Sequence, residues 1–410
     1  MVPADVAWML TSTALVLLMT PALAFFYGGL VRSTNVLNTM MMSFIALAFV
    51  GVAWAVIGYS LAFAPGSSWL GGLSRLFLRG VDLEPEGTIP RVLHMSYQGT
   101  FAIITAALIS GAIVERMRFS AYVVFITLWS VLVYAPVAHW VWGGGWLAGM
   151  GALDFAGGTV VHVNAAAAAL VAVIVVGPRR GDRSGILPHN VPFTLLGAGL
   201  LWFGWFGFNA GSALAANAIA ALAFTTTMLA PAGTLGVWTL LDLVRGKRPT
   251  AVGAATAIVV GLVAVTPAAG FVSPMSALLL GMFAAPTSYF ALIWRARTSL
   301  DDSLDVVAAH GVGGTVGALL TGVFAQKSWN GATDGLLFGN PGQVAVQAAA
   351  VLGAMIFSAV VTFVLLKAIG LVVPLRADDR DEDMGLDLSQ HGEEAYTRGE
   401  GNIPVGLSSH

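Results

Sequence analysis

Residues 154–171 read DFAGGTVVHVNAAAAALV, and this stretch decides what kind of chain this is. It begins with an aspartate, reaches a histidine eight residues later, and continues as an apolar run to Gly177 without another charged residue. A helix needs about 20 mainly apolar residues to cross the hydrocarbon core of a bilayer. The stretch therefore predicts a membrane-spanning helix that carries a histidine inside the membrane.

A second stretch, DSLDVVAAHGV at 302–312, has the same design, since its histidine also follows an aspartate by eight residues. Another matching pair, FFYGG near Phe25 and FGFNAGS near Phe208, supports the relation. Both pairs recur five predicted spans apart, and because five is odd the second copy crosses the membrane in the opposite sense. The pattern predicts an inverted repeat over about 8–177 and 191–324, with a central site where the repeats meet, as in many transporters.

Apolar runs of sufficient length occur eleven times, and each is predicted to be a transmembrane helix. The last run follows the two repeats as a single additional helix. The first run is too long for the apolar part of a secretory signal, and no basic residue precedes Arg32, so we expect this run to remain as a spanning helix. The runs are 8–31, 40–63, 92–114, 119–138, 158–177, 191–210, 218–243, 251–270, 275–294, 304–324 and 343–372.

The composition agrees with a membrane protein. Hydrophobic residues make up 57% of the chain and charged residues 10%, whereas a soluble domain carries about 25% charged residues. A soluble enzyme or a nucleic-acid-binding protein is excluded, and the net charge of −2 provides no basic patch. The chain has no cysteine, which excludes disulfides, thiolate metal sites and cysteine nucleophiles. The predicted fold class is an all-α polytopic membrane protein with eleven transmembrane helices in residues 1–374.

The basic residues predict the orientation. Loops on one side of the membrane carry eleven Lys or Arg residues and loops on the other side carry four. Because cytoplasmic loops are enriched in basic residues, we expect the N-terminus outside the cell membrane and the C-terminus in the cytoplasm. The eleven are Arg32, Arg116, Arg118, Arg179, Arg180, Arg183, Arg245, Lys247, Arg248, Arg295 and Arg297, and the four are Arg75, Arg79, Arg91 and Lys327.

Residues 375–410 differ from the rest of the chain, with nine acidic residues and three arginines, a net charge of −6. Composition alone is typical of a solvated, partly disordered tail. The predicted orientation, however, places the tail beside the basic inner loops, and opposite charge favours docking, although salt screens exposed pairs. We expect an acidic cytoplasmic regulatory tail that is ordered near 376–397 and frayed beyond Asn402.

His162 and His310 are predicted to meet at the middle of the membrane. Eight helical residues rise about 12 Å, close to half of a core about 30 Å thick, and the two copies enter from opposite faces. A single intramembrane histidine is compatible with a packing role, but two at one depth indicate a pathway or a proton relay. Zinc requires three or four ligands, and no other His, Asp, Glu or Cys side chain is predicted at this depth. We therefore expect no metal and no other cofactor. Because burial disfavours the charged form of an imidazole, we expect a neutral pair that shares a ring hydrogen bond.

Taken in order along the chain, these segments resemble the ammonium transporters of the Amt/Mep/Rh group. The resemblance covers nearly the whole chain, and the tryptophan of HWVWGGG together with the tail is typical of the Amt branch. The segments that carry the resemblance are ALVLLMTPALAFFYGGLVR, YQGTFAIITAALISGAIVERMRFSA, HWVWGGG, DFAGGTVVHVNAAAAALV, WFGWFGFNAGSAL, HGVGGTVGALLTGVFA and GLDLSQHGEEAY.

The resemblance implies an outer vestibule where Trp142, Phe101 and Ser212 hold an ammonium ion, while Asp154 shapes the site without touching the ion. An aromatic face attracts a cation by about 0.5–2 kcal/mol, and a hydroxyl oxygen accepts an ammonium hydrogen bond. Each residue also has a plain structural interpretation. Trp142 suits the aromatic belt of a membrane interface, Phe101 suits core packing, Ser212 suits a helix interface and Asp154 suits a helix N-cap.

The resemblance further implies that Phe101 and Phe208 stack as a gate above His162 and His310. Potassium and ammonium have similar size and charge, but ammonium donates hydrogen bonds and can lose a proton. A desolvated pore excludes bare cations, and an imidazole pair can accept the proton while ammonia moves on. The expected function is therefore ammonium uptake through a pore, with net charge transfer and without enzymatic activity.

Two other functions deserve comparison with transport. One is an ammonium sensor that signals through the tail, which would take up little of the analogue methylammonium. The other is a membrane-embedded enzyme, which is disfavoured because neither a nucleophile nor a metal set accompanies the histidines. As partners, the resemblance implies the lipid bilayer, two further copies in a homotrimer, and a PII-type signalling protein on the cytoplasmic side.

Overall fold

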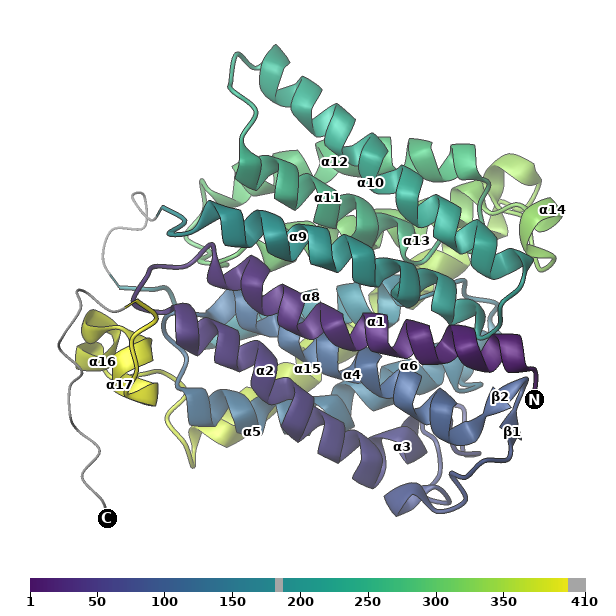
Figure 1. Cartoon of the computed structure of the whole chain (residues 1–410), viewed down its shortest axis with the longest axis horizontal. Coiled ribbons are helices and arrows are strands. Elements are labelled where there is room, and N and C mark those ends of the chain that lie inside the picture. Colours follow the sequence, from purple (N-terminus) through teal and green to yellow (C-terminus); the bar gives the residue numbers. More distant parts are fainter. Residues whose placement is uncertain (181–186, 397–410) are drawn as a thin grey trace.

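The computed structural model describes residues 1–180 and 187–396. Long helices run side by side along the longest axis, with the short helices of the tail at one end, called the tail end below, and the N-terminus near the other (Figure 1). Helices satisfy every backbone polar group internally, as a bilayer requires. The prediction of an all-helical polytopic membrane protein is confirmed. The expectations for Arg183 and for residues beyond 396, Asn402 included, lie outside the described residues.

Ten helical segments in the described ranges are long and apolar enough to cross a membrane. They match ten of the eleven predicted runs, and the fourth extends beyond its predicted end at 138. The ten segments are Pro3–Gly28, Val36–Phe63, Arg91–Ile113, Phe119–Gly149, Gly158–Val176, Val191–Ala213, Ala218–Val244, Pro274–Arg295, Val307–Phe324 and Gly342–Gly370.

The predicted run 251–270 forms a shorter helix. Helix α11, Ala251–Val265, has 15 residues, which rise about 22 Å, less than the core thickness of about 30 Å. Pro267 has no N–H to continue the helical hydrogen-bond ladder, and the chain turns instead, with the Ala268 N–H bonded to the Val265 carbonyl at 2.9 Å.

Several long segments consist of consecutive elements, and five of the segments in the described part contain a π-helical turn. In a π-helical turn the backbone is wound more widely than in an α-helix, and such turns are frequent at functional sites.

The helices are α1 Pro3–Gly28, α2 Val36–Ala53, α3 Tyr59–Phe63, α4 Arg91–Ile113, α5 Phe119–Trp129, α6 Ala135–Trp142, α7 Trp146–Gly149, α8 Asn164–Val176, α9 Val191–Trp205, α10 Ala218–Val244, α11 Ala251–Val265, α12 Pro274–Arg295, α13 Gly313–Phe324, α14 Lys327–Asn330, α15 Gly342–Gly370, α16 Asp379–Met384 and α17 Leu386–His391. The π-helical turns are η1 Trp54–Gly58, η3 Ser130–Tyr134, η4 Gly158–Val163, η5 Phe206–Ala210 and η7 Val307–Val312, and the short 3-10 turns are η2 Leu76–Leu78, η6 Gly211–Ala213 and η8 Leu336–Phe338. Strands β1 Pro85–Glu86 and β2 Ile89–Pro90 pair antiparallel in a loop.

Close helix packing depends on small residues, as is common in membranes. A Cβ atom on Gly281 of α12 would lie 2.0 Å from the Ala230 carbonyl oxygen of α10. A Cβ atom on Gly317 of α13 would lie 2.2 Å from the Ala264 carbonyl oxygen of α11. At both positions only glycine allows the two backbones to approach this closely.

The described part of the tail, up to residue 396, is docked on the bundle. Leu386 is fully buried, and its N–H donates to the Asn35 side chain at 2.8 Å. Asp387 accepts from the Asn38 N–H at 2.7 Å and so caps the first turn of α2 from another part of the chain. The Gln390 side chain accepts from the Phe119 N–H at 2.6 Å. Hydrogen bonds between side chains and backbone N–H groups, together with ion pairs such as Arg118–Asp378, join the tail to the bundle.

Candidate functional site

Phe101 of α4 and Phe208 of η5 stack against each other in the interior of the bundle. Their ring centroids lie 4.2 Å apart at 25°, and both side chains are buried. Trp142, at the end of α6, meets Phe101 edge-on at 5.9 Å. The structure therefore brings together three of the predicted residues in the order Trp142, Phe101, Phe208.

Tyr97 connects this aromatic group to Ser212. The Tyr97 hydroxyl lies 2.9 Å from the Phe208 carbonyl oxygen and 3.3 Å from the Ser212 hydroxyl. Ser212 in turn donates to the Phe208 carbonyl at 2.8 Å. Among the described contacts, Ser212 is joined to the backbone of the Phe208 turn and not to Trp142.

Asp154 lies at the start of the π-helical turn η4 and receives four backbone N–H groups. One carboxylate oxygen accepts from Gly157 at 2.8 Å and Gly158 at 2.6 Å. The other accepts from Thr159 at 2.8 Å and Val160 at 3.0 Å. A carboxylate suits these positive N–H groups at a helix start. The Asp154 side chain therefore caps the start of η4, although the N-cap position itself is Gly157. The Asp154 backbone carbonyl also accepts from the indole N–H of Trp142, a half-buried residue, at 2.9 Å.

Asp302 repeats this design at the start of η7, where it accepts from Val306 at 3.1 Å and Val307 at 2.7 Å. The two copies are antiparallel, because Arg179, just after α8, bonds Asp301, just before η7. In each copy the histidine lies within the π-helical turn that its aspartate caps.

The histidines meet as predicted. The Nδ1 atoms of His162 and His310 lie 3.2 Å apart, and both side chains are buried. Since both contacting atoms are ring nitrogens, one must carry the hydrogen and the other must accept it. His162 also stacks on Phe208, with centroids 6.1 Å apart at 24°. The ring contacts therefore continue from the stacked phenylalanines to the histidine pair.

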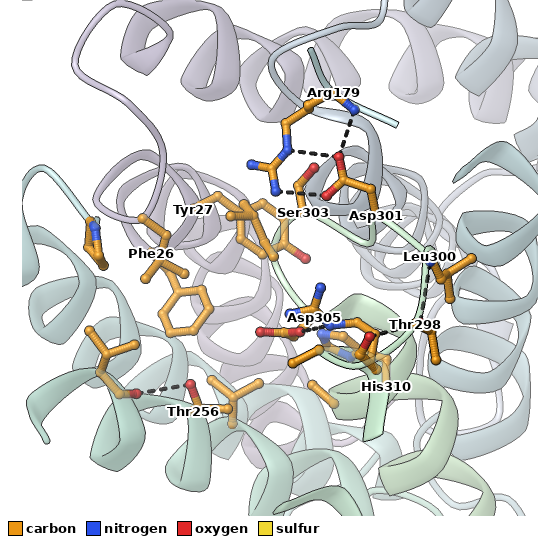
Figure 2. Close-up of a pocket in the computed structure, with 18 residues that line it drawn as sticks. Phe26, Tyr27, Arg179, Thr256, Thr298, Leu300, Asp301, Ser303, Asp305 and His310 are labelled. Carbon is orange, nitrogen blue, oxygen red and sulfur yellow. Dashed lines mark hydrogen bonds and ion pairs between the residues drawn. The ribbon is translucent and has the colours of Figure 1, made fainter. Parts of the chain in front are cut away.

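Two cavities follow this line of rings. A cavity of about 20 Å³ beside Phe208 is lined by apolar side chains and the histidine pair, and this is room for about one molecule of the size of water or ammonia. A second, larger cavity of about 740 Å³ lies towards the tail end of the bundle, and His310 lines it as well as the small cavity (Figure 2). Asp305 and Tyr27 also line the larger cavity (Figure 2).

Two further residues of the site were not predicted from the sequence: Tyr97, which contacts Ser212, and Trp205, which lines the small cavity. Trp205 stacks on His162 at 5.5 Å and 25°, and its indole N–H is fixed by the Thr266 hydroxyl at 2.9 Å. Both residues lie one helical turn before a predicted phenylalanine, since Tyr97 precedes Phe101 by four residues and Trp205 precedes Phe208 by three. Residues three or four apart share a helix face, and this spacing was the available signal.

Membrane-length helices around a line of stacked rings, which reaches a buried histidine pair with cavities beside it, define a polytopic membrane transport protein. The comparisons with known proteins agree. Residues 7–396 match the family model described as Ammonium Transporter Family, so the chain belongs to the ammonium transporter family. It is a transporter of ammonium and not an enzyme.

Relatives are similar over nearly their whole length. An ammonium transporter of Bacillus subtilis is 47% identical over 397 residues, covering 96% of this chain and 98% of that protein. The crystal structure of Candida albicans Mep2 has a TM-score of 0.88 and 35% identity, covering 96% of this chain and 90% of that one. A structure described as a sensor Amt protein has a TM-score of 0.88 and 29% identity, with coverages of 94% and 98%.

Proposed function

We propose that the protein recruits ammonium at an outer vestibule, deprotonates it near the gate and passes ammonia along the histidine pair, with net transfer of the proton. The observation that carries this proposal is the short contact between His162 and His310 below the stacked phenylalanines. A bare cation in so narrow an apolar passage would lose its hydration, whereas ammonia is neutral. The unpartnered Nε2 atom of His162, within the described residues, is free to meet the passing molecule.

A current measurement on liposomes tests the proposal. A pulse of ammonium should give a transient inward current with the purified protein, and an equal pulse of potassium should give none. Ammonium uptake without any current would indicate passage of ammonia alone. Equal currents for both ions would contradict deprotonation at the gate.

The ring of Trp142 faces Phe101, and this contact supports its role in recruitment. We therefore expect Trp142→Leu to change the half-saturation concentration for methylammonium by about 2- to 30-fold, as expected when an interaction between a cation and an aromatic ring is lost. Trp294, a tryptophan that is 67% exposed, provides the control, since Trp294→Leu should leave the concentration dependence unchanged. If the two variants behave alike, Trp142 is only an interfacial residue.

We further propose eleven crossings in an inverted five-plus-five repeat plus α15, with the N-terminus outside and the tail in the cytoplasm of the cell membrane. The antiparallel Asp–His copies support this arrangement, because each histidine is reached from a different end of the bundle. α11 would be the shortest crossing. Labelling of single cysteines added at the N-terminus and in the tail, with a membrane-impermeant reagent on whole cells, should modify only the former.

A homotrimer with one pore in each subunit is proposed as the assembled form. Many large apolar side chains on the long helices are exposed in the single chain, among them Phe203 of α9 and Phe283 of α12. Mass measurement in mild detergent should give three copies. A stable monomer that still transports would contradict this assembly.

The tail, residues 375–410, is proposed to be a regulatory element. Its docking on Asn35 and Asn38 connects it to the start of α2, and a PII-type signalling protein is the proposed cytoplasmic partner at the same end. Deleting everything after Pro374 should lower the transport rate several-fold and leave potassium excluded, because the deletion spares the passage. Full activity of the truncated protein at every salt concentration would contradict regulation.

The alternative function is sensing through the tail. The similarity to the sensor Amt protein favours it as the second candidate, and the docked tail offers a route for a signal. Uptake of labelled methylammonium distinguishes the two functions. Uptake well above that of empty liposomes supports transport, and negligible uptake with retained binding supports sensing.

A further inference from the structure

His139 lies in the last turn of α6 and is held by two carbonyl oxygens. Its side chain is almost fully buried, with 2% of the residue exposed. Nδ1 lies 2.9 Å from the carbonyl oxygen of Ala62, and Nε2 lies 2.8 Å from the carbonyl oxygen of Ser67. A carbonyl oxygen accepts hydrogen bonds and cannot donate one. Each of the two ring nitrogens therefore needs its own hydrogen.

The neighbouring contacts have the same polarity. The Trp146 N–H donates to the Ser68 carbonyl at 2.9 Å, and the Trp140 indole N–H donates to the Trp69 carbonyl at 2.8 Å. At this contact the chain segment 62–69 supplies the hydrogen-bond acceptors. The end of α6 and the residues after it supply the donors. A ring with two donors fits that arrangement, and a ring with one donor does not.

The packing between α6 and residues 62–69 is tight enough to fix the His139 ring. A Cβ atom on Gly143 would lie 2.0 Å from the Ala62 carbonyl oxygen and 2.6 Å from Nδ1 of His139. The His139 carbonyl also accepts from the N–H groups of Gly143 at 3.0 Å and Gly145 at 2.9 Å. The His139 side chain thus binds the segment 62–67, and its backbone carbonyl binds the turn that follows Trp142.

We infer that His139 is a doubly protonated imidazolium and acts as a positioning residue that holds the end of α6, and with it Trp142, against residues 62–69. A neutral imidazole would point a lone pair at a carbonyl oxygen at less than 3 Å. Burying a cation is costly, but two charge-assisted hydrogen bonds offset that cost. Trp142 follows three residues later, so movement of this turn would shift its ring against Phe101.

No carboxylate shares the proton. None of the ion pairs among the described residues includes His139. The backbone carbonyls alone therefore hold the charge. The ionisable side chains on the elements that pack against α6, and in the loop that holds Ser67, are Tyr59, Arg75, Arg79, Asp82, Glu84, Glu86, Tyr134, Asp154 and His162.

Nitrogen-15 NMR of histidine-labelled protein in lipid bilayers tests the protonation state directly. An ordinary imidazole is mostly neutral at pH 7, whereas the His139 ring should show two protonated nitrogens. Subtracting the spectrum of His139→Gln assigns the signal. If that variant does not fold, contacts from the ring nitrogens to carbon-13-labelled alanine and serine carbonyls assign it in the unmodified protein. One protonated and one bare nitrogen would overturn the proposal.

Transport provides the second readout, and this arm rests on the proposed function. His139→Gln should raise the half-saturation concentration for methylammonium by about threefold or more, as expected for one lost hydrogen bond. The matched control is His94→Gln, since His94 is buried but its ring meets the Tyr59 hydroxyl, which can donate or accept.

The outcomes of the two readouts are distinguishable. An unchanged half-saturation concentration in His139→Gln, or an equal rise in His94→Gln, would overturn the positioning role of His139. If no protein, unmodified or variant, transports methylammonium, the proposed function fails, and the NMR result for His139 stands independently.

Discussion

Replacing both His162 and His310 by alanine is expected to let potassium through the pore. The two rings line the small cavity beside Phe208, which has a volume of about 20 Å³, and their Nδ1 atoms lie 3.2 Å apart. Removing both creates space for a hydrated ion and removes the acceptor of the ammonium proton. The ratio of potassium to ammonium current should rise at least about tenfold, equivalent to about 1.4 kcal/mol.

Currents in liposomes, normalised to the amount of inserted protein, measure this ratio. His189→Ala is the matched control, because His189 contacts Tyr396 of the tail at 2.9 Å and lines neither of the two cavities. Its ratio should equal that of the unmodified protein. A double variant that conducts ammonium and still excludes potassium would contradict the relay, and selectivity would then reside in the phenylalanine gate.

The membrane helices and the histidine pair could be predicted because both depend on local patterns. An apolar run longer than about 20 residues has few alternatives to a spanning helix, and the Asp–His spacing recurs where the same capped turn recurs. The end of α11 was not predicted, although Pro267 was visible, because the surrounding residues stay apolar and hydropathy does not detect a missing N–H.

The π-helical turns, and the particular hydrogen bonds that hold the docked tail, could not be predicted in this way. The turn that holds His162 depends on Asp154 gathering four N–H groups, which is a property of the folded backbone. The tail has the composition of a solvated segment, yet Leu386 and Asp387 bind the start of α2 through hydrogen bonds that charge counting does not reveal. Distant contacts decided both features.

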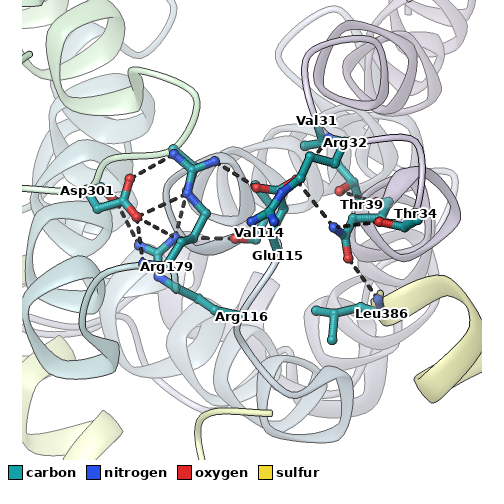
Figure 3. A network of polar contacts seen from close by, with 12 residues as sticks. Val31, Arg32, Thr34, Thr39, Val114, Glu115, Arg116, Arg179, Asp301 and Leu386 are labelled. Atoms are coloured by element: carbon teal, nitrogen blue, oxygen red, sulfur yellow. Dashed lines mark hydrogen bonds and ion pairs between the residues drawn. The ribbon is translucent and has the colours of Figure 1, made fainter. Parts of the chain in front are cut away.

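A buried network of charges joins the loops at the tail end of the bundle (Figure 3). Arg179 bonds Glu115 and Asp301, each at 2.8 Å, and neither carboxylate is more than 2% exposed. Glu115 also accepts from Arg32 at 3.2 Å. Burial raises the pKa of Asp301, but the hydrogen bonds and positive charge of Arg179 outweigh burial and hold it at about 2. The pair is therefore ionised throughout the neutral pH range.

Arg179→Leu is expected to destabilise the protein by about 3–5 kcal/mol, because removing one partner leaves buried charges uncompensated. The next residue provides a matched control. Arg180 pairs with Asp379 of the tail, but its side chain is 42% exposed and that of Asp379 is 76% exposed, and exposed pairs contribute little. The midpoint of thermal unfolding in detergent should therefore fall by many degrees for Arg179→Leu and hardly change for Arg180→Leu.

Because a depressed carboxylate pKa stabilises the fold only above that pKa, the difference between the two midpoints should persist from pH 8 down to pH 5 and shrink only in strong acid. Equal midpoints for the two variants would mean that the network adds nothing beyond a surface ion pair, and that helix packing alone joins the two antiparallel copies.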